Sequence, residues 1–443
     1  MKYKQFNILL LLQVFLFIQC STAETSDSTE KKQHNDFVNT SQMTDLNTSS
    51  SDSNKDKAIK TKNNNIEGLK QNNFKRVEFG FNIGYLNDLQ DANLYERALS
   101  QIKQDGITDL RIYEPFTKNI VQNPGLADKL LSPLTGNGFK ILLCLSNYPN
   151  ISSLHYNKAM NNPEQNNMMR FTNRRAPDNI DAYQSYLTNF LDNFQSKNLL
   201  QDMSFEIGNE PDAKKYFWGQ TEDFIKIAKA IKQSLAKYNK PIYCCGFTSN
   251  FANQGSSKNV DYYNFLNDNS FFDNVNLSFH FYKNQINDIT KIHLPRLNNS
   301  IITEFNLFTS LTQKSDSKND IVNSPEFGSV LIKALVFAYR NNVKKIYLFR
   351  LADTKDKQTT YGFFDNNGNA KPCYKYFTQI YNVIKDGYNI GVTSNYINIV
   401  GKEETILYAI RNKISIPQKQ IVASSKENNI KNLNNDEWVI FKN

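Results

Sequence analysis

The stretch SFEIGNEPDAKKYFW, residues 204–218, decides the fold and carries the first sign of a function. Its apolar beginning is rich in strand-forming residues and runs directly into Asn209, Glu210, Pro211 and Asp212. Asn, Asp and Pro commonly end strands, so an ordinary loop start is one interpretation. An amide and a carboxylate at one strand end also suit a catalytic site. The rest of the chain decides between these interpretations.

Eight short apolar segments recur along the chain, and the quoted stretch belongs to the fourth. Each is rich in β-branched or aromatic residues and is continuous rather than alternating, which is typical of strands covered by helices. They begin at residues 79, 108, 139, 203, 241, 276, 301 and 344. Amphipathic helical patterns separate them. Eight strands alternating with helices over about 310 residues predict an α/β fold, the (β/α)8 TIM barrel, which typically needs roughly 250 residues before insertions.

Three of the intervening helices can be placed from their apolar spacing and start signals. In residues 178–197 apolar side chains recur at three- and four-residue steps, and Asp178 after Pro177 is the predicted N-cap. Two further helices are predicted to begin at Glu222 and Pro325. The structural alternative is a doubly wound open sheet. That fold often carries a Gly-rich phosphate loop after its first strand, which residues 80–88 do not convincingly supply.

The N-terminal part of the chain predicts export. Residues 1–23 combine a basic start with an apolar core that is too short for a comfortable membrane span, and they are typical of a signal peptide. Cys20 directly follows that core, so lipid modification at Cys20 is an alternative to free secretion. Residues 24–74 contain almost no large apolar side chains and predict a disordered Ser/Asn/Lys-rich linker. We therefore expect a secreted or cell-surface protein.

The barrel is predicted to span residues 75–385 and to be followed by a small β-rich appendage at 386–443. The net charge of +9 is spread without long basic blocks, which argues against a nucleic-acid partner. Cys144, Cys244 and Cys245 lie inside apolar strand-like runs, so buried thiols are expected rather than a disulfide framework. No CxxC or His-rich spacing suggests a zinc site, and no cofactor is predicted.

Polar residues at the C-terminal ends of barrel strands point into the catalytic mouth. In this chain they are Asn82, Arg111, Asn147, Tyr148, Asn209, Glu210, His280, Tyr282 and Glu304. The fourth strand ends in Glu210 and the seventh in Glu304, so these carboxylates can converge across the barrel. Retaining glycoside hydrolysis uses two carboxyl groups about 5–5.5 Å apart, one as acid and one as nucleophile. Asn209 can then bond a sugar 2-hydroxyl, while Pro211 stiffens the turn.

The motif GNEPD at 208–212, with ITEFN at 302–306, resembles glycoside hydrolase clan A, the retaining (β/α)8 enzymes. The resemblance covers about residues 75–385 and does not distinguish families 39, 79 and 5. It implies that Glu210 is the acid/base and Glu304 the nucleophile. Arg111 resembles the second-strand arginine that holds the nucleophile, and the segment containing His280 and Tyr282 resembles the sixth-strand His-any-Tyr pattern. The expected activity is that of a β-glycosidase acting on a polysaccharide or oligosaccharide.

One departure from the clan concerns the floor of the sugar site. Many members present a Trp at the end of the eighth strand, where this chain has Phe349, Arg350 and Asp353. A charged group there would favour an acidic or highly polar sugar. Trp218, eight residues beyond Glu210, is either a stacking platform for sugar or part of the core.

The segment between the third and fourth strands, residues 148–177, is the longest inter-strand insertion on the presumed catalytic face. Its arginines, Arg170, Arg174 and Arg175, are candidates for contacts with acidic sugars, with an ordinary solvated basic loop as the alternative.

Other functions and simpler structural roles remain open at this level. The barrel could be a carbohydrate-binding pseudoenzyme, although such a protein would normally have lost one glutamate. It could also be a metal-dependent enzyme with Glu210, Glu304 and His280 as ligands, although further His, Asp or Lys residues are missing. Arg111 could be a plain salt-bridge partner and His280 a core histidine. Glu206, inside the fourth strand, is expected to pair with a basic group.

Overall fold

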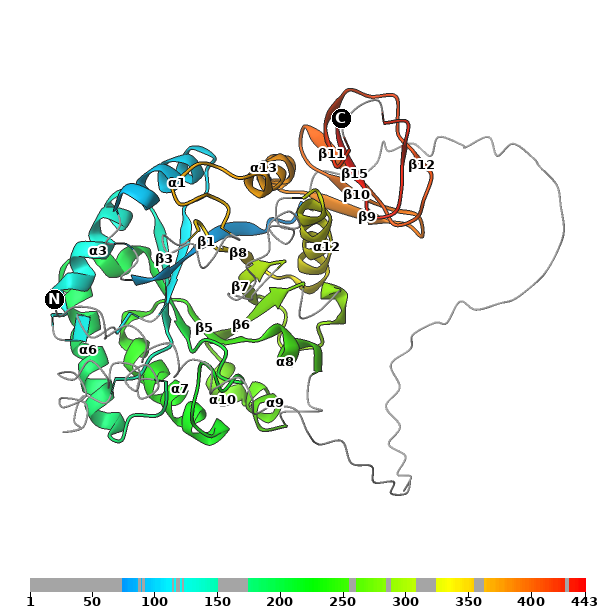
Figure 1. Cartoon of the computed structure of the whole chain (residues 1–443). Helices are drawn as coiled ribbons and strands as arrows, with labels where there is room; N and C mark the ends of the chain where they lie inside the picture. Colours follow the sequence, from blue (N-terminus) through cyan, green and yellow to red (C-terminus); the bar gives the residue numbers. More distant parts are fainter. Residues whose placement is uncertain are drawn as a thin grey trace, which may run out of the picture. The chain divides into compact units, whose positions relative to one another are not determined.

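Eight parallel strands close into a barrel, and each strand pairs with its neighbours in the sequence (Figure 1). The computed structural model describes residues 74–443 apart from 87–88, 90–91, 114, 117–119, 122, 150–173, 255–259, 284–287, 308–323, 354–361 and 427–429. The strands are β1 (Glu78–Tyr85), β2 (Asp109–Tyr113), β3 (Lys140–Leu145), β4 (Met203–Ile207), β5 (Ile242–Phe247), β6 (Val275–Tyr282), β7 (Ile301–Asn306) and β8 (Lys345–Phe349). The predicted barrel is confirmed, and all eight predicted strands are present. The predicted signal peptide, with Cys20, and the linker up to residue 73 lie outside the described residues.

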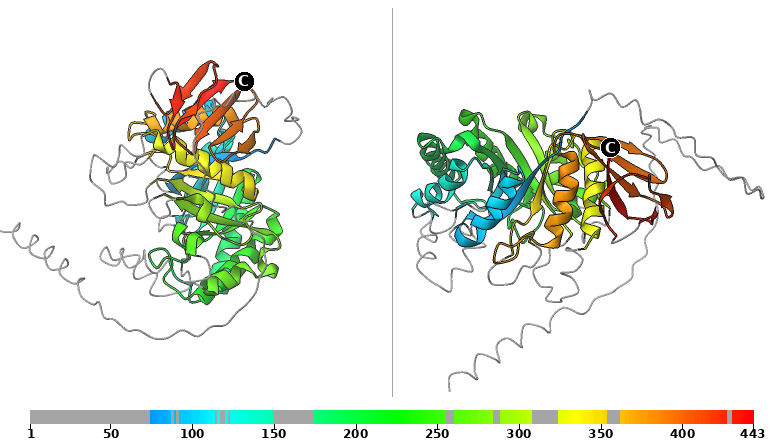
Figure 2. Two further views of the ribbon diagram at one scale, coloured as in Figure 1. Left: turned by 90° about the vertical axis from the view of Figure 1, so that its right-hand side faces the viewer. Right: turned by 90° about the horizontal axis from the view of Figure 1, so that it is seen from above.

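Helices surround the barrel in Figures 1 and 2. They are α1 (Ala92–Gln104), α3 (Gly125–Gly136), α6 (Ile180–Ser196), α7 (Thr221–Leu235), α8 (Ser249–Gln254), α9 (Val260–Leu266), α10 (Asn269–Phe272), α12 (Glu326–Asn341) and α13 (Pro372–Ile384). None of the described helices combines the length and the hydropathy needed to cross a bilayer. The two other predicted helix starts, at 222 and 325, fall within one residue of the observed ones.

Helix α6 shows how the sequence builds this outer layer, and it corrects one prediction. Its N-cap is Asn179, whose side chain accepts a hydrogen bond from the backbone of Ala182 at 2.9 Å. Asp178 instead lies on the surface beside Arg175. Both residue types cap helices well, so composition alone does not choose between neighbours. The predicted apolar face, including Phe190 and Phe194, is buried against the barrel.

The appendage is a five-stranded antiparallel sheet with the order β13-β15-β11-β10-β9, next to a small two-stranded pair, β12 and β14. Its strands are β9 (Asn389–Val392), β10 (Tyr396–Val400), β11 (Glu404–Ala409), β12 (Ile414–Ser415), β13 (Ile421–Ser424), β14 (Asn432–Leu433) and β15 (Trp438–Lys442). It packs on α12 through the buried Trp438, which donates to the Pro325 carbonyl at 3.3 Å. A Cβ on Gly328 would lie 2.7 Å from the Trp438 nitrogen, so glycine is needed for this close approach. The predicted β-rich appendage is confirmed.

The cysteines correct a second expectation. Cys144 and Cys373 are buried free thiols, as expected for Cys144, but the adjacent residues Cys244 and Cys245 form a disulfide on β5. Both forms are compatible with a fully buried apolar strand, so the apolar context of these residues did not distinguish them.

Candidate active site

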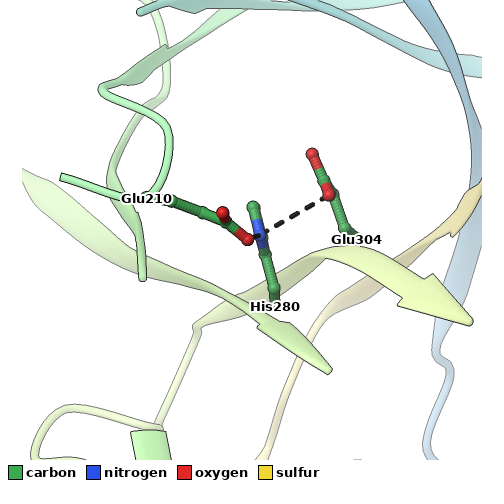
Figure 3. Close-up of side chains that lie close together, drawn as sticks. All are labelled: Glu210, His280 and Glu304. Atoms are coloured by element: carbon green, nitrogen blue, oxygen red, sulfur yellow. Dashed lines mark hydrogen bonds and ion pairs between the residues drawn. The ribbon is translucent and has the colours of Figure 1, made fainter. Parts of the chain in front are cut away.

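The side chains expected to carry chemistry meet at the C-terminal end of the barrel, over four of its strands. Arg111 comes from β2, Glu210 from the turn after β4, His280 from β6 and Glu304 from β7. His280 and Glu304 are direct register partners on adjacent strands. Figure 3 shows the His280 ring between the two carboxylates, with Glu210 reaching across from its turn.

The turn that carries Glu210 is held from several sides. The Glu210 backbone N–H donates to the Gly246 carbonyl at 2.9 Å, and its own carbonyl accepts from Ala213 at 2.9 Å. The Pro211 carbonyl accepts from the hydroxyl of Tyr262 at 2.8 Å. Glu210 itself has φ 49°, a left-handed conformation that costs a non-glycine residue on the order of 1–3 kcal/mol. These hydrogen bonds hold that conformation and aim the side chain at His280.

Asp212, two residues after Glu210, is held by a further set of hydrogen bonds in the same turn. Its carboxylate accepts from the backbone N–H of Thr248 at 3.0 Å and from the Thr248 hydroxyl. Burial, together with the nearby charge of Glu210, raises the pKa of Asp212 to about 6 despite the hydrogen bonds from Thr248. The ionised form is therefore the less stable form in the folded protein.

We expect Asp212→Asn to change how stability depends on pH. Because the folded-state pKa lies above the unfolded value, Asp212 disfavours folding increasingly as the pH rises from about 4 to 6. The uncharged variant should gain relative to the parent by up to about 3 kcal/mol between pH 4 and 7. Urea unfolding at a series of pH values measures this difference. Asp178→Asn, at an exposed site, is the control. A parent–variant difference that stays constant with pH would contradict the expectation.

Glu304 is held as an ionised carboxylate. Arg111 donates to its Oε1 at 2.7 Å, and the Tyr282 hydroxyl donates to its Oε2. Burial by itself would raise the pKa of Glu304, but the charges of His280 and Arg111 and the two hydrogen bonds outweigh it and lower that pKa. A carboxylate that stays charged is suited to attack an electrophilic carbon.

Arg111 connects three groups of the site. It lies fully buried and donates through Nε to Glu206 at 2.6 Å and through Nη2 to Asn209 Oδ1 at 2.6 Å, besides its bond to Glu304. Burial opposes the charged form, but the charges of Glu206 and Glu304 keep the pKa of Arg111 well above its ordinary range. The predicted pairing of Glu206 with a basic group is thus present. Because Asn209 Oδ1 accepts from Arg111, the amide group of Asn209 remains a donor.

His280 lies between the two glutamates. Its Nδ1 lies 2.8 Å from Glu210 Oε1 and 3.6 Å from Glu304 Oε2. Burial would lower the pKa of His280, whereas the charge of Glu304 and the contact with Glu210 raise it. Oxygens of the two glutamates lie within 4.8 Å of one another. This separation matches a site in which one carboxylate attacks and the other donates a proton, and is shorter than the roughly 6.5–9.5 Å that inversion needs.

Two further predicted substrate-binding residues, Asn82 and Trp218, make contacts of their own outside this group. Asn82 is fully buried and donates through Nδ2 to the Thr303 carbonyl at 3.0 Å, so it supports the barrel wall beside Glu304. Trp218 is 57% exposed, which excludes the core alternative. Its backbone N–H donates to the Arg174 carbonyl at 2.7 Å.

The basic insertion is only partly described, since residues 150–173 with Arg170 lie outside the described residues. Arg174 is buried, and its guanidinium donates to the Lys215 carbonyl at 2.9 Å and lies over the Tyr216 ring at 5.3 Å. Arg175 is exposed beside Asp178. Arg174 therefore supports a tyrosine of the β4 loop.

Tyr216 was not predicted from the sequence. Burial, followed by the charges of Glu210 and Glu304, raises the pKa of its hydroxyl well above the ordinary value. The charge of Tyr85 on β1, whose ring centroid lies 4.6 Å from that of Tyr113 on β2, also raises the pKa of Tyr216. The aromatic residue six positions after Glu210 was the available signal.

The end of β8 does not present an open charge to the site. Phe349 packs edge-on against Tyr282 at 5.9 Å, and Arg350 donates to the Ile83 carbonyl at 2.6 Å. Asp353 pairs with Lys371 at 3.0 Å. These contacts place both charged groups in structural roles, so the hypothesis of an acidic sugar receives no support from them.

Glu210, His280 and Glu304 also form a cluster that could hold a metal ion, because one donor atom from each lies within 4.8 Å of the others. The surroundings do not fit this use. Both oxygens of Glu304 already accept hydrogen bonds, from Arg111 and Tyr282. The permanent charge of Arg111 would repel a second cation at this distance. The donor set favours acid–base chemistry.

Comparison with known proteins identifies the fold but not a sequence family. No model of a known protein family matches the chain, and no curated protein matches its sequence. A family 39 β-xylosidase from Caulobacter crescentus is 11% identical with a TM-score of 0.55, covering 83% of this chain and 95% of that one. The chain has the fold of clan A glycoside hydrolases.

Two further solved structures share this fold. A conserved exported protein from Bacteroides fragilis is 9% identical with a TM-score of 0.54, covering 83% of this chain and 98% of that one. A family 39 enzyme from Xanthomonas axonopodis pv. citri is 8% identical with a TM-score of 0.52, covering 79% and 76%. The likeness is one of fold, so the activity has to be argued from the site.

Proposed function

We propose that this protein is a retaining β-glycosidase that cleaves O-glycosidic bonds of a polysaccharide or oligosaccharide by double displacement. The observation that carries the proposal is the approach of the Glu210 and Glu304 carboxylates to within 4.8 Å, with Arg111 bound to Glu304. Retention needs a short separation, because the second carboxylate attacks the sugar carbon directly with no water between them.

The contacts of each glutamate support a distinct role for it. Glu304 accepts from Arg111 and Tyr282 and stays charged, so it attacks the anomeric carbon. Glu210 faces His280 Nδ1 from the turn after β4, and its role is to protonate the departing oxygen. Water then attacks the glycosyl-enzyme while Glu210 takes up its proton. Asn209 offers its amide donor to the sugar hydroxyl next to the reacting carbon.

The exposed Trp218 ring supports a substrate longer than one sugar, because an aromatic face in the loop after Glu210 can stack on a further ring. The proposed signal peptide would place the enzyme outside the cytoplasm, where polysaccharides are available, either secreted or anchored at Cys20. A carbohydrate-binding protein without activity would not need a charged nucleophile held beside a proton donor.

The test is the stereochemistry of hydrolysis. Purified protein is assayed on a panel of aryl β-glycosides and polysaccharides, and the first product from each cleaved substrate is observed by proton NMR. We expect the β-anomer to form first, with unchanged rates after chelator treatment. Initial formation of the α-anomer would contradict retention. Loss of activity on chelation, restored by a divalent metal, would favour the metal-dependent alternative. Binding without turnover across the panel would favour the pseudoenzyme.

A further inference from the structure

Glu206 is a buried carboxylate that the proposed reaction does not use. It lies on β4 four residues before Glu210 and is fully buried. Its Oε2 accepts from Arg111 at 2.6 Å, but its Oε1 accepts no hydrogen bond from any described residue. Buried carboxylate oxygens are normally paired, so this atom calls for a donor.

A second buried atom without a partner faces the same place. His280 uses Nδ1 for its contact with Glu210, and its Nε2 has no hydrogen-bond partner among the described residues. A Cβ placed on Gly246 would lie 3.1 Å from Glu206 Oε1 and 3.3 Å from His280 Nε2. Both atoms therefore converge on the face of Gly246 that carries no side chain. The Gly208 carbonyl, 3.4 Å from the same point, adds a third polar atom.

Gly246 is suited to this place by its backbone. Its φ of 61° is left-handed, a conformation that side-chain-bearing residues rarely adopt. Its carbonyl also accepts the hydrogen bond of Glu210, and its N–H donates to the Ser278 hydroxyl at 2.8 Å. Gly246, which accepts the hydrogen bond of Glu210, thus also leaves the space between Glu206 Oε1 and His280 Nε2 free of a side chain.

We propose that Glu206 is a positioning residue: a hydrogen-bonded bridge across Gly246, through one buried water, keeps a proton on Nε2 of His280. A carboxylate and a carbonyl oxygen can only accept, so the water gives its two hydrogens to Glu206 Oε1 and the Gly208 carbonyl and accepts from Nε2. Nδ1 of neutral His280 then accepts a hydrogen bond from protonated Glu210. When the proton of that hydrogen bond passes to Nδ1, the imidazolium donates the same hydrogen bond to the Glu210 carboxylate.

The catalytic meaning of this arrangement rests on the proposed function. Glu210 has to hold a proton in the first step and to lose it before the second, and one nitrogen atom serves both forms without a side-chain rearrangement. The charged or titratable groups facing His280 are Glu206 and Glu210 on the β4 segment, Glu304 on β7, Arg111 on β2 and Tyr282 on β6. Glu206 thus accepts from Arg111 with Oε2, and it acts on His280 with Oε1.

Nitrogen-15 NMR of histidine-labelled protein tests the proton directly. The chain has four histidines, and the His280→Asn variant identifies the His280 signals. In the unaltered protein we expect neutral His280 to carry its proton on Nε2. In Glu206→Gln the single amide oxygen stays with Arg111, so the amide NH2 faces Nε2. We expect the proton to move to Nδ1 in that variant.

Asp109→Asn is the matched control. It removes a buried carboxylate that pairs with Lys345 at the start of β2 and β8, at the opposite end of the barrel. We expect the His280 signals to be unchanged in it. Neutral His280 protonated on Nδ1 in the unaltered protein would overturn the proposal. This measurement needs no variant, so it decides the matter even if Glu206→Gln fails to fold.

Kinetics separate this proposal from the proposed function. With Glu206→Gln we expect kcat/KM to fall roughly tenfold to hundredfold for glycosides with poor leaving groups, the scale of one charge-assisted hydrogen bond. Activated aryl glycosides, which need no acid, should change little in their first step. An equal loss for both substrate classes would reduce Glu206 to a packing role. An Nε2 proton that depends on Glu206 in a protein without glycosidase activity would sink only the proposed function.

Discussion

Glu304→Ala should abolish turnover of every glycoside, including activated aryl glycosides, with kcat/KM lower by at least about 10⁴-fold, the scale seen when a reacting group is removed from a catalytic unit. The reason is geometric. Glu304 is the carboxylate that Arg111 and Tyr282 keep charged, and no other described carboxylate lies within 4.8 Å of Glu210 with both of these donors on it. Without Glu304 no covalent intermediate can form.

Labelling by a 2-fluoro glycoside inactivator tests the nucleophile role of Glu304 in the unaltered protein. It should label the peptide that carries Glu304, as read by mass spectrometry, and Glu304→Ala should take up no label. The variant is expected to fold, because Arg111 keeps its bonds to Glu206 and Asn209. Glu304→Gln keeps an acceptor for Arg111 and serves as the matched control, equally inactive. A label on Glu206 or Glu210 would show that the nucleophile has been misassigned.

The charged state of Glu304 also sets an acid limit for the reaction. The charges of His280 and Arg111 and the hydrogen bond from Tyr282 lower its pKa against the effect of burial. Glu304 therefore stays ionised below the pH at which an ordinary glutamate becomes protonated. The ionised Glu304 also stabilises the folded state. This stabilisation is present at pH values above the pKa of Glu304 in the unfolded chain, and it is lost as the pH falls through its pKa in the folded protein.

The sequence predicted the barrel because the signals are local and repeated. Eight apolar segments of strand length, separated by helical periodicity, leave few folds to consider. The positions of Glu210 and Glu304 followed from the strand ends, since every parallel strand of a barrel ends on the same face. Arg111 and Glu206 were each expected to form an ion pair, because a buried charged group is rarely unpaired.

The rest depended on contacts between segments that are distant in the sequence. Asn82 was placed in the mouth because the first strand was expected to end near it, but β1 continues to Tyr85 and the Asn82 amide donates to the Thr303 carbonyl. Arg350 follows β8 and donates to the Ile83 carbonyl. The role of Gly246 is visible only when Glu206 and His280 are both in place. Side-chain direction at a strand end is set by such neighbours, which local pattern does not contain.

Glu210→Ala should show a selective defect, larger than the one expected for Glu206→Gln. The variant cannot protonate a departing oxygen, so glycosides with poor leaving groups should lose roughly 10²–10⁴-fold in kcat/KM, the usual contribution of a general acid. Activated aryl glycosides need no proton on departure and should still form the glycosyl-enzyme on Glu304. That intermediate should accumulate, because the base for the second step is missing as well. A burst of the released phenol followed by slow turnover measures this.

Added azide distinguishes a missing base from a damaged site. A small anion can enter the space left by the Glu210 side chain and attack the intermediate without a base, so turnover of activated substrates should rise and the product should be a β-glycosyl azide. In Glu304→Ala the same anion would replace the nucleophile and give the α-configured azide. The opposite configurations of the azide products from the two variants therefore test the two roles in one mechanism. If Glu210→Ala loses activity equally on both substrate classes, shows no burst and is not rescued by azide, then Glu210 is not the acid/base, and the turn held by Gly246 and Tyr262 serves another purpose.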